Sequence, residues 1–213
     1  RNFANKLWNA TKFVLINKTS NENYLFQEND ENYLELPDKW ILSKLNQVNI
    51  KVANLLNQYK LGESAKLLYE FSWNDFCDWY VEFAKQRLHN KENKNRRISE
   101  KVLIKVLTDI LVMIHPFMPH ITEELWHALQ IKPPEILLAL QNWPIQENKF
   151  INIDLDKSFQ QLFEIIRLIR NLRVELGLKP SQNIPVFLIT DNETIRNFLK
   201  SLVPDIKTLT KSS

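Results

Sequence analysis

The sequence predicts an all-α fold, a helical bundle over residues 1–145, followed by a small α/β appendage over residues 146–213 that contains one strand. Two observations predict the bundle. Apolar residues recur at spacings of three and four through most of the first 130 residues, which is the pattern of helices that bury one face. The stretch 69–88 is rich in aromatic residues and holds neither glycine nor proline. The strand is predicted from a third observation, the run of β-branched and aromatic residues at 184–190.

The aromatic-rich stretch 69–88 predicts the central helix of the bundle. As an α-helix it places these residues on one side: Leu68, Ser72, Phe76, Trp79, Tyr80, Phe83 and Arg87. Trp73 and Cys77 flank that side, so the apolar arc is wide. A helix that is apolar over so much of its circumference must contact more than one neighbour. We therefore interpret its aromatic residues as core.

Residues 1–16 predict the first helix, with Phe3, Leu7, Ala10 and Val14 facing inward. The opposite face carries a continuous stripe of amides and cations, made of Asn2, Asn5, Lys6, Asn9 and Lys12. Such a stripe is either an ordinary solvated face or a surface for RNA. Amides can pair with base edges and ammonium groups with phosphates.

The next segments predict a loop and three further bundle helices. Residues 19–38 hold six acidic and no basic side chains, so phosphate would be repelled there. Asp38 is placed to cap a helix over 39–59, and Gly62 marks the turn that follows. Ser99 is predicted to cap a helix with a nearly all-apolar face that ends near Ile114, and Pro119 suits the first turn of the next helix.

A basic run joins the central helix to the loop after it. Residues 85–97 hold six basic side chains and a single glutamate, and the basic ones are Lys85, Arg87, Lys91, Lys94, Arg96 and Arg97. The run is either a solvated loop or a contact for phosphate.

The remainder predicts a connector and the appendage. Residues 131–153 contain three prolines and should cross the bundle as a strap. A helix over 155–176 follows, with Arg167, Arg170 and Arg173 along one edge and Gly177 as its C-terminal cap. After the strand, residues 193–203 predict a last short helix.

Composition excludes several classes of function. Two glycines in 213 residues exclude a phosphate-binding loop or a dinucleotide fingerprint, and a net charge of +3 does not by itself indicate nucleic acid. Cys77 is the single cysteine, so no internal disulfide can form, and we interpret it as a buried thiol in a reducing compartment. No apolar run approaches the roughly 18 residues of a membrane span, and no signal peptide opens the chain. We therefore expect a cytoplasmic protein with no membrane association.

The sequence indicates neither a catalytic constellation nor a metal site. No nucleophile has a base at a supporting spacing. His120 and His127 could be combined with Glu123 or Glu124, but no Cys or Asp completes a tetrahedral set. The residues alone therefore indicate a helical module that binds a partner, with the Asn/Lys stripe as its candidate site.

Four stretches resemble one known family. They are RNFANKLWNATKFVL at 1–15, DKWILSKLN at 38–46, YEFSWNDFCDWYVEFAK at 69–85 and HPFMPHITEELW at 115–126. In this order they resemble the region that follows the catalytic domain in valyl-tRNA synthetases, and IRNLRVELGLKPSQNIPVFL at 169–188 resembles the segment after it. Leucyl and isoleucyl enzymes carry strings similar to HPFMPHITEELW, whereas WNDFCDWYVE at 73–82 favours the valyl family.

This resemblance implies the C-terminal anticodon-binding bundle of a class I aminoacyl-tRNA synthetase. In the full-length enzyme, other domains use ATP and Mg²⁺ to activate valine, charge the tRNA and edit mischarged threonine. The HIGH and KMSKS motifs are absent here, so we expect the chain to be inactive alone and to hold no cofactor. We interpret it as a piece of a longer, monomeric protein, ending before the coiled-coil arm. The implied partners are tRNA(Val) and the catalytic and editing domains of the same polypeptide.

The resemblance also implies the site. The first bundle helix lies near the anticodon in this family, and the matching positions are Arg1, Asn5, Lys6, Asn9 and Lys12, with Asn2 beside them. We expect the cations to hold phosphates or stack and the asparagines to approach base edges. Weaker candidates for the tRNA backbone are Lys85, Arg87, Arg96, Arg97, Arg170 and Arg173. Two alternatives remain, the same module of an isoleucyl or leucyl enzyme, and a helical scaffold that binds proteins and not RNA.

Overall fold

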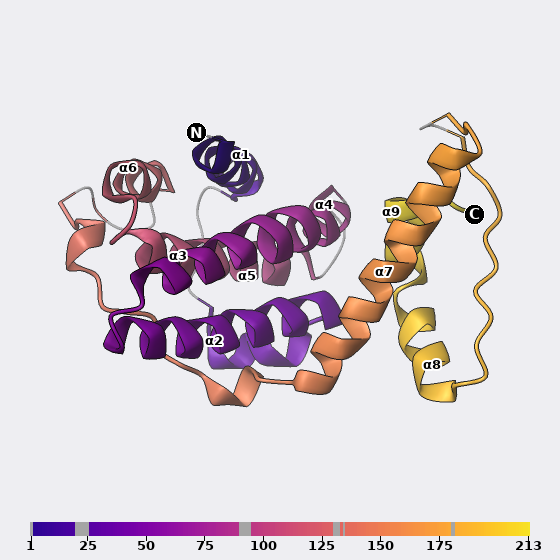
Figure 1. The fold of residues 1–213 in the computed structure, drawn as a ribbon. Helices are drawn as coiled ribbons and strands as arrows, with labels where there is room; N and C mark the ends of the chain where they lie inside the picture. Colours follow the sequence, from indigo (N-terminus) through magenta and orange to yellow (C-terminus); the bar gives the residue numbers. More distant parts are fainter. Residues whose placement is uncertain (1, 20–25, 90–94, 130–132, 134, 180–181) are drawn as a thin grey trace. The chain divides into compact units, whose positions relative to one another are not determined.

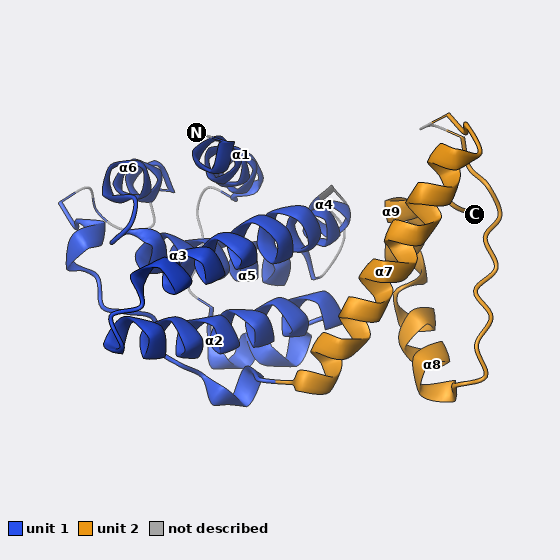
Figure 2. Ribbon diagram, viewed as in Figure 1, with its two compact units in different colours: residues 1–151 blue, residues 152–213 orange. Residues whose placement is uncertain are grey.

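The computed structural model describes residues 2–19, 26–89, 95–129, 133, 135–179 and 182–213. They form two compact units, residues 1–151 and residues 152–213 (Figure 2). The sequence placed the boundary at 145/146, six residues before the division seen here. Among the described residues the regular secondary structure is helical apart from a single isolated β-bridge, so the all-α prediction is confirmed.

Unit 1 is a layered helical bundle (Figure 1). Its elements are α1 (Asn2–Asn17), η1 (Glu28–Tyr33), α2 (Leu36–Asn57), α3 (Leu61–Glu70), η2 (Phe71–Tyr80), α4 (Val81–His89), α5 (Arg96–Ile114), α6 (Pro119–Leu129), η3 (Leu138–Leu140) and η4 (Asn148–Phe150). The middle layer is the continuous rod α3–η2–α4 together with α5. Helices α1 and α6 lie side by side on one face of this layer, and α2 packs on the opposite face. This arrangement leaves the outer side of α1 to solvent.

The sequence predicted one regular α-helix for the central rod. The rod differs from this prediction because η2 is a π-helix of ten residues. Its hydrogen bonds join residues five apart, as in the bond from the Val81 N–H to the Phe76 carbonyl. Residues five apart therefore recur on one side, and Phe71, Phe76 and Val81 are all buried. The core prediction holds for Trp79, Tyr80 and Phe83, which are at most 5% exposed, whereas Trp73 is half-buried and Tyr69 is 43% exposed.

Several helix ends differ from those predicted. Glu35 is the N-cap of α2, and Asp38 lies one turn inside, where its carboxylate accepts a hydrogen bond from the Glu35 N–H at 3.1 Å. Tyr59, with φ of 58°, supplies the left-handed residue of the next turn in place of Gly62. Helix α5 begins at Arg96 after Asn95, so Ser99 lies inside the helix and does not cap it. Pro119 does begin α6, as predicted.

The connector after α6 straps across unit 1, as the sequence predicted. The Trp126 indole N–H donates to the Ile136 carbonyl at 2.9 Å, which holds the start of the strap. Further along, the Trp143 indole N–H donates to Asn49 Oδ1 at 2.6 Å, and Asn49 Nδ2 donates to the Pro144 carbonyl at 2.9 Å. The strap therefore crosses from α6 to α2.

Unit 2 consists of α7 (Ile153–Glu175), α8 (Glu193–Ser201) and α9 (Val203–Thr210). Its core is made of Phe159, Leu162, Phe163, Ile166, Leu199, Leu202 and Ile206. Gly177, with φ of 63°, follows the end of α7 as predicted. The last helix was predicted over 193–203, but it ends at Ser201 and a second one, α9, begins at Val203 before Pro204.

The predicted strand at 184–190 is wrong as a sheet element. The segment is extended, but only Ile184 forms a bridge, to Ser212 in the parallel sense. A strand becomes stable only when a neighbour satisfies its backbone groups, and the described residues supply that neighbour at one position alone.

Candidate nucleic-acid interface

Helix α1 carries most of the predicted site residues whose side chains have no hydrogen-bond or ion-pair partner among the described residues. Leu7, Ala10 and Val14 anchor the helix because they are at most 7% exposed. The opposite face is open, and Asn2, Asn5, Asn9 and Lys12 are exposed. Among the described residues these four side chains have no hydrogen-bond or ion-pair partner. Their donors and acceptors are therefore free for a ligand.

An exposed tryptophan that the sequence reasoning missed lies on the same face. Trp8 is 46% exposed, although burial of an indole is strongly favourable. It follows Asn5 by three residues and precedes Lys12 by four, and residues at these spacings are neighbours on a helix surface. That spacing was visible in the sequence and could have identified it. We call Asn2, Asn5, Trp8, Asn9 and Lys12 the α1 face.

Lys6 is turned away from the α1 face, contrary to its placement in the predicted stripe. Its ammonium lies 3.9 Å from the centroid of the Trp73 ring and pairs with the Asp78 carboxylate. Trp73 also stacks with Tyr69 at a centroid distance of 5.6 Å. These contacts hold α1 to η2. For Lys6 to bind a phosphate, it would have to exchange Asp78 for that phosphate.

A shallow groove of about 310 Å³ runs along the border of the α1 face. It is lined by Lys6, Asn9, Ala10 and Phe13 of α1, Cys77 and Asp78 of η2, and Val81, Glu82 and Lys85 of α4. Asn9 belongs both to this groove and to the α1 face. The two surfaces are therefore continuous.

The polar groups of the groove are balanced in charge. Lys6 pairs with Asp78, and Lys85 pairs with Glu82. The Lys85 ammonium also lies 5.8 Å from the Phe13 ring centroid. Burial raises the pKa of Cys77 to about 12, so its thiol is neutral. A groove with two ion pairs and an apolar floor suits a planar polar group such as a base better than a bare phosphate.

The remaining cationic residues of the predicted site and of the basic run do not gather around the groove. Arg1 lies outside the described residues, as do Lys91 and Lys94 of the basic run. Arg96 is half-buried and donates to the Leu88 carbonyl at 3.0 Å, whereas Arg97 is exposed in the first turn of α5. Only Lys85 of the weaker candidates borders the groove.

Arg87 does not lie on the surface, so its prediction as a tRNA contact has to be corrected. Its side chain is 6% exposed, and Nη1 lies 2.7 Å from Asp38 Oδ2 and 3.6 Å from Glu35 Oε2. The Tyr80 hydroxyl donates to the other Asp38 oxygen at 2.7 Å. Burial raises the pKa of Tyr80 well above its ordinary value. The cluster joins α2 to the central rod. The sequence could not show this contact, because Asp38 and Arg87 are 49 residues apart.

The two arginines of unit 2 are also engaged within their own unit. Arg173 is 7% exposed, and its guanidinium donates to three backbone carbonyls at 2.7–3.1 Å, those of Lys179, Gln182 and Lys211. Arg170 is exposed, and its Nε donates to the Leu209 carbonyl at 3.0 Å. The fork of Arg173 closes the loops after α7 and α9, and this burial removes it from contact with a phosphate.

The described residues hold neither a cluster of metal-binding side chains nor a membrane-spanning helix. They contain no group of three or more His, Cys, Asp or Glu side chains arranged to hold a metal ion. Nor does any helix among them have the length and apolar character needed to cross a membrane.

Comparison with known proteins gives a family match over most of the chain. Residues 38–188 match the family described as the anticodon-binding domain of tRNA ligase. The chain is 76% identical over its whole length to a valine–tRNA ligase of Prochlorococcus marinus subsp. pastoris, of which it covers 23%. It is 51% identical over its whole length to the corresponding protein of Prochlorococcus marinus strain NATL2A, again covering 23%. The valine–tRNA ligase of Synechocystis is 45% identical over 94% of the chain, which covers 22% of that protein.

These matches span both units, and they include α1, which precedes the family match at residue 38. The chain spans about a quarter of the length of these relatives. Since the family match covers more than half of the chain, the chain belongs to the family of anticodon-binding domains of tRNA ligases.

Proposed function

We propose that this chain is the anticodon-binding part of a valine–tRNA ligase and that the α1 face contacts the anticodon loop of tRNA(Val). The observation that carries the proposal is the juxtaposition of free amides, an exposed indole and a free ammonium on one helix face. The family of the chain supports the class of ligand, and the names of its relatives support valine.

The chemistry of the α1 face matches the way single-stranded RNA is read. Unstacked bases of a loop stack on aromatic side chains and form hydrogen bonds through their edges. Trp8 supplies the stacking surface, and Asn5 and Asn9 lie within a turn of it with both a donor and an acceptor each. Lys12, one turn further along, supplies charge for a neighbouring phosphate.

The groove gives a second base a place beside this face. A base that enters it meets the Phe13 ring and the aliphatic side chain of Val81, with the Asn9 amide at the rim. The paired carboxylates of Asp78 and Glu82 can accept hydrogen bonds from exocyclic amino groups. The α1 face and the groove thus hold consecutive bases, and Asn9 lies between them.

Catalysis belongs to the part of the polypeptide outside this chain. The whole protein would charge tRNA(Val) with valine at the expense of ATP, with Mg²⁺, as a cytoplasmic monomer that also edits. The described residues do not suit the binding of the Mg²⁺ that accompanies ATP, because they contain no cluster of carboxylates that could hold a metal ion. The chain therefore contributes binding and orientation of the tRNA.

The test compares matched variants in titrations of an anticodon stem–loop RNA with the tRNA(Val) anticodon. Trp8→Ala should weaken binding by about 5- to 150-fold, because a lost stacking contact costs about 1–3 kcal/mol. Lys12→Ala should weaken it less and should flatten its dependence on salt, since one phosphate contact is lost. Tyr33→Ala and Lys51→Ala remove an exposed aromatic side chain and an exposed cation elsewhere in unit 1. If these controls weaken binding as much as Trp8→Ala and Lys12→Ala do, the α1 face is not the site.

A further inference from the structure

Two residues of α1, one helical turn apart, contact the central rod next to the α1 face. The centroid of the Phe3 ring lies 5.0 Å from that of Tyr69 and 6.5 Å from that of Trp73. One turn further along α1, the Lys6 ammonium lies 3.9 Å from the centroid of the Trp73 ring and pairs with the Asp78 carboxylate. Helix α1 therefore contacts one indole of η2 from two positions and a carboxylate of η2 from one of them.

The π-helical form of η2 allows Lys6 to contact both of its partners at once. Trp73 and Asp78 are five residues apart, and the hydrogen bonds of a π-helix join residues five apart. In a regular α-helix, five residues rotate the side-chain direction by about 140° past a full turn. The residues one turn beyond Trp73 would then be Phe76 and Cys77, and Asp78 would lie on another side. The π-helix thus places an aromatic ring and a carboxylate on the side of the rod that meets one lysine.

The contacts of Lys6 are directional, unlike the apolar contacts that bury α1. The Lys6 side chain is 22% exposed, and the Asp78 side chain is 48% exposed. An ammonium that lies over an indole and pairs with a carboxylate loses these contacts when its helix slides or rotates. Burial of Leu7 and Val14 favours contact with the bundle, but the hydrophobic effect has no preferred direction. Lys6 therefore fixes the position of α1 along the rod more closely than the apolar residues do.

The candidate RNA site depends on this position, because α1 supplies one wall of the groove. Lys6, Asn9 and Phe13 line the groove from α1, and Val81 and Glu82 line it from α4. Asn9 also belongs to the α1 face. A shift of α1 against the rod would therefore change the width of the groove and the distance from the Asn9 amide to the side chains opposite.

From these contacts we propose that Lys6 is a positioning residue for RNA binding, which fixes α1 against the π-helix and does not bind a phosphate. The proposal rests on the proposed function, since it concerns the same α1 face and groove. It replaces the direct RNA contact that the sequence alone predicted for Lys6. It also gives a role to the π-helix, a form that is rare and often occurs at functional sites.

The first measurement is amide hydrogen exchange of the peptide 2–17 in the 213-residue chain without RNA. Lys6→Met keeps an unbranched apolar side chain but removes the charge. The peptide should exchange about fivefold faster in this variant, a factor that corresponds to about 1 kcal/mol of lost contact. Peptides from α2 and α5 should exchange as in the wild type, which separates a local effect from a loss of overall stability.

Two further variants control this measurement. Lys6→Arg keeps the charge and can still lie over the indole, so it should retain the slow exchange of the peptide 2–17. Lys66→Met removes a lysine whose ion pair, with Glu70 at 3.8 Å, lies within α3. It should leave the exchange of the peptide 2–17 unchanged, because this pair does not involve α1.

The second measurement is the salt dependence of binding to the anticodon stem–loop RNA. Lys6→Met should weaken binding about threefold or more, as expected when the competent position of α1 falls to about a third of the population. The slope of log affinity against log salt concentration should stay unchanged, because no phosphate contact is lost.

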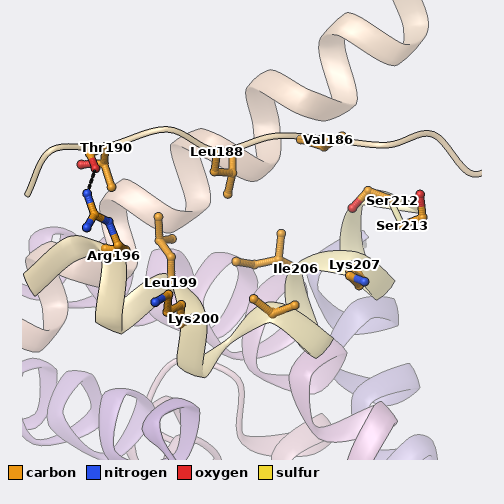
Figure 3. Close-up of a pocket in the computed structure, with 11 residues that line it drawn as sticks. Val186, Leu188, Thr190, Arg196, Leu199, Lys200, Ile206, Lys207, Ser212 and Ser213 are labelled. Atoms are coloured by element: carbon orange, nitrogen blue, oxygen red, sulfur yellow. Dashed lines mark hydrogen bonds between the residues drawn. The ribbon is translucent and has the colours of Figure 1, made fainter. Parts of the chain in front are cut away.

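Lys200→Met is the control for the loss of one cation away from α1. Lys200 lines a pocket of about 340 Å³ in unit 2, to which Leu199 and Ile206 also contribute (Figure 3). Among the described residues Lys200 has no ion-pair partner. Its replacement should leave the exchange of the peptide 2–17 unchanged and should weaken RNA binding less than Lys6→Met does.

Asp78→Asn tests whether the effect of Lys6 passes through its partner in η2. Lys6→Met and Asp78→Asn remove the same ion pair. The double variant should therefore bind RNA more tightly than the product of the two single losses predicts. A lysine that bound a phosphate directly would instead be released by Asp78→Asn, and binding would strengthen.

Three results would overturn the proposal. The first is unchanged exchange of the peptide 2–17 in Lys6→Met. The second is a salt slope that falls by about 0.7 or more in Lys6→Met, which would make Lys6 a phosphate contact. The third is additive losses in the double variant. Absence of RNA binding by the wild-type chain, together with faster exchange in Lys6→Met, would instead overturn the proposed function and support the positioning of α1 by Lys6.

Discussion

Replacement of Arg87 by alanine should destabilise unit 1 strongly while leaving RNA contacts intact. The Arg87 guanidinium and the Asp38 carboxylate are 2.7 Å apart, with side-chain exposures of 6% and 0%. Removal of one partner from a buried pair leaves an uncompensated charge, which costs about 3–5 kcal/mol. With a urea slope of about 2 kcal/mol per M, the unfolding midpoint should fall by roughly 1.5–2.5 M.

The assay is urea unfolding followed by tryptophan fluorescence, with two comparison variants. Arg87→Lys keeps the charge but loses the planar fork, so its midpoint should lie between those of the wild type and Arg87→Ala. Arg96→Ala removes a half-buried arginine whose hydrogen bond goes to the Leu88 carbonyl, and it should cost about 1 kcal/mol. The reasoning is refuted if Arg87→Ala and Arg96→Ala have the same midpoint, or if Arg87→Ala keeps its stability but flattens the salt dependence of RNA binding.

Two more predictions concern the Cys77 thiol and the hydrogen bond between Trp143 and Asn49. With the Cys77 pKa at about 12, alkylation of the folded chain at pH 8 should be about a thousandfold slower than alkylation of the chain in urea, because the thiolate is the reactive form. Similar rates would contradict the raised pKa of the thiol. Because the folded chain holds this proton more tightly, the contribution of the thiol to stability is complete below about pH 9 and is lost as the pH rises toward 12. Trp143→Phe removes the indole N–H that donates to Asn49 Oδ1 at 2.6 Å. The free energy of unfolding should fall by about 1–3 kcal/mol, because the buried acceptor loses its donor. An unchanged free energy of unfolding would show that the strap does not depend on this bond.

The parts of the fold that follow local rules were predictable from the sequence. The apolar spacing of Leu7 and Val14 gave the buried side of α1, and Pro119 and Gly177 marked helix ends through backbone geometry that few other residues share. The π-helix was not predictable in this way. Its residues also satisfy an α-helical apolar pattern, and only the hydrogen bonds distinguish the two forms.

The candidate site was predictable in outline but not in its electrostatics. Asn5, Asn9 and Lys12 are exposed, as their spacing opposite the apolar face requires. Which cations are free depends on distant residues, since Asp78 engages Lys6 across 72 positions and Asp38 engages Arg87 across 49. A count of charges along the chain carries no information on such pairs.

If the α1 face reads the anticodon of tRNA(Val), the affinity of the chain for tRNA should depend on the anticodon sequence. The most direct measurement is the affinity of the chain for a tRNA(Val) transcript and for the same transcript with a substituted anticodon, at low and moderate salt. We expect tighter binding to the natural anticodon at both salt concentrations. This preference should disappear when Asn5 and Asn9 are both replaced by alanine. Equal affinity of the wild-type chain for the two transcripts at both salt concentrations would show that the α1 face does not read the anticodon.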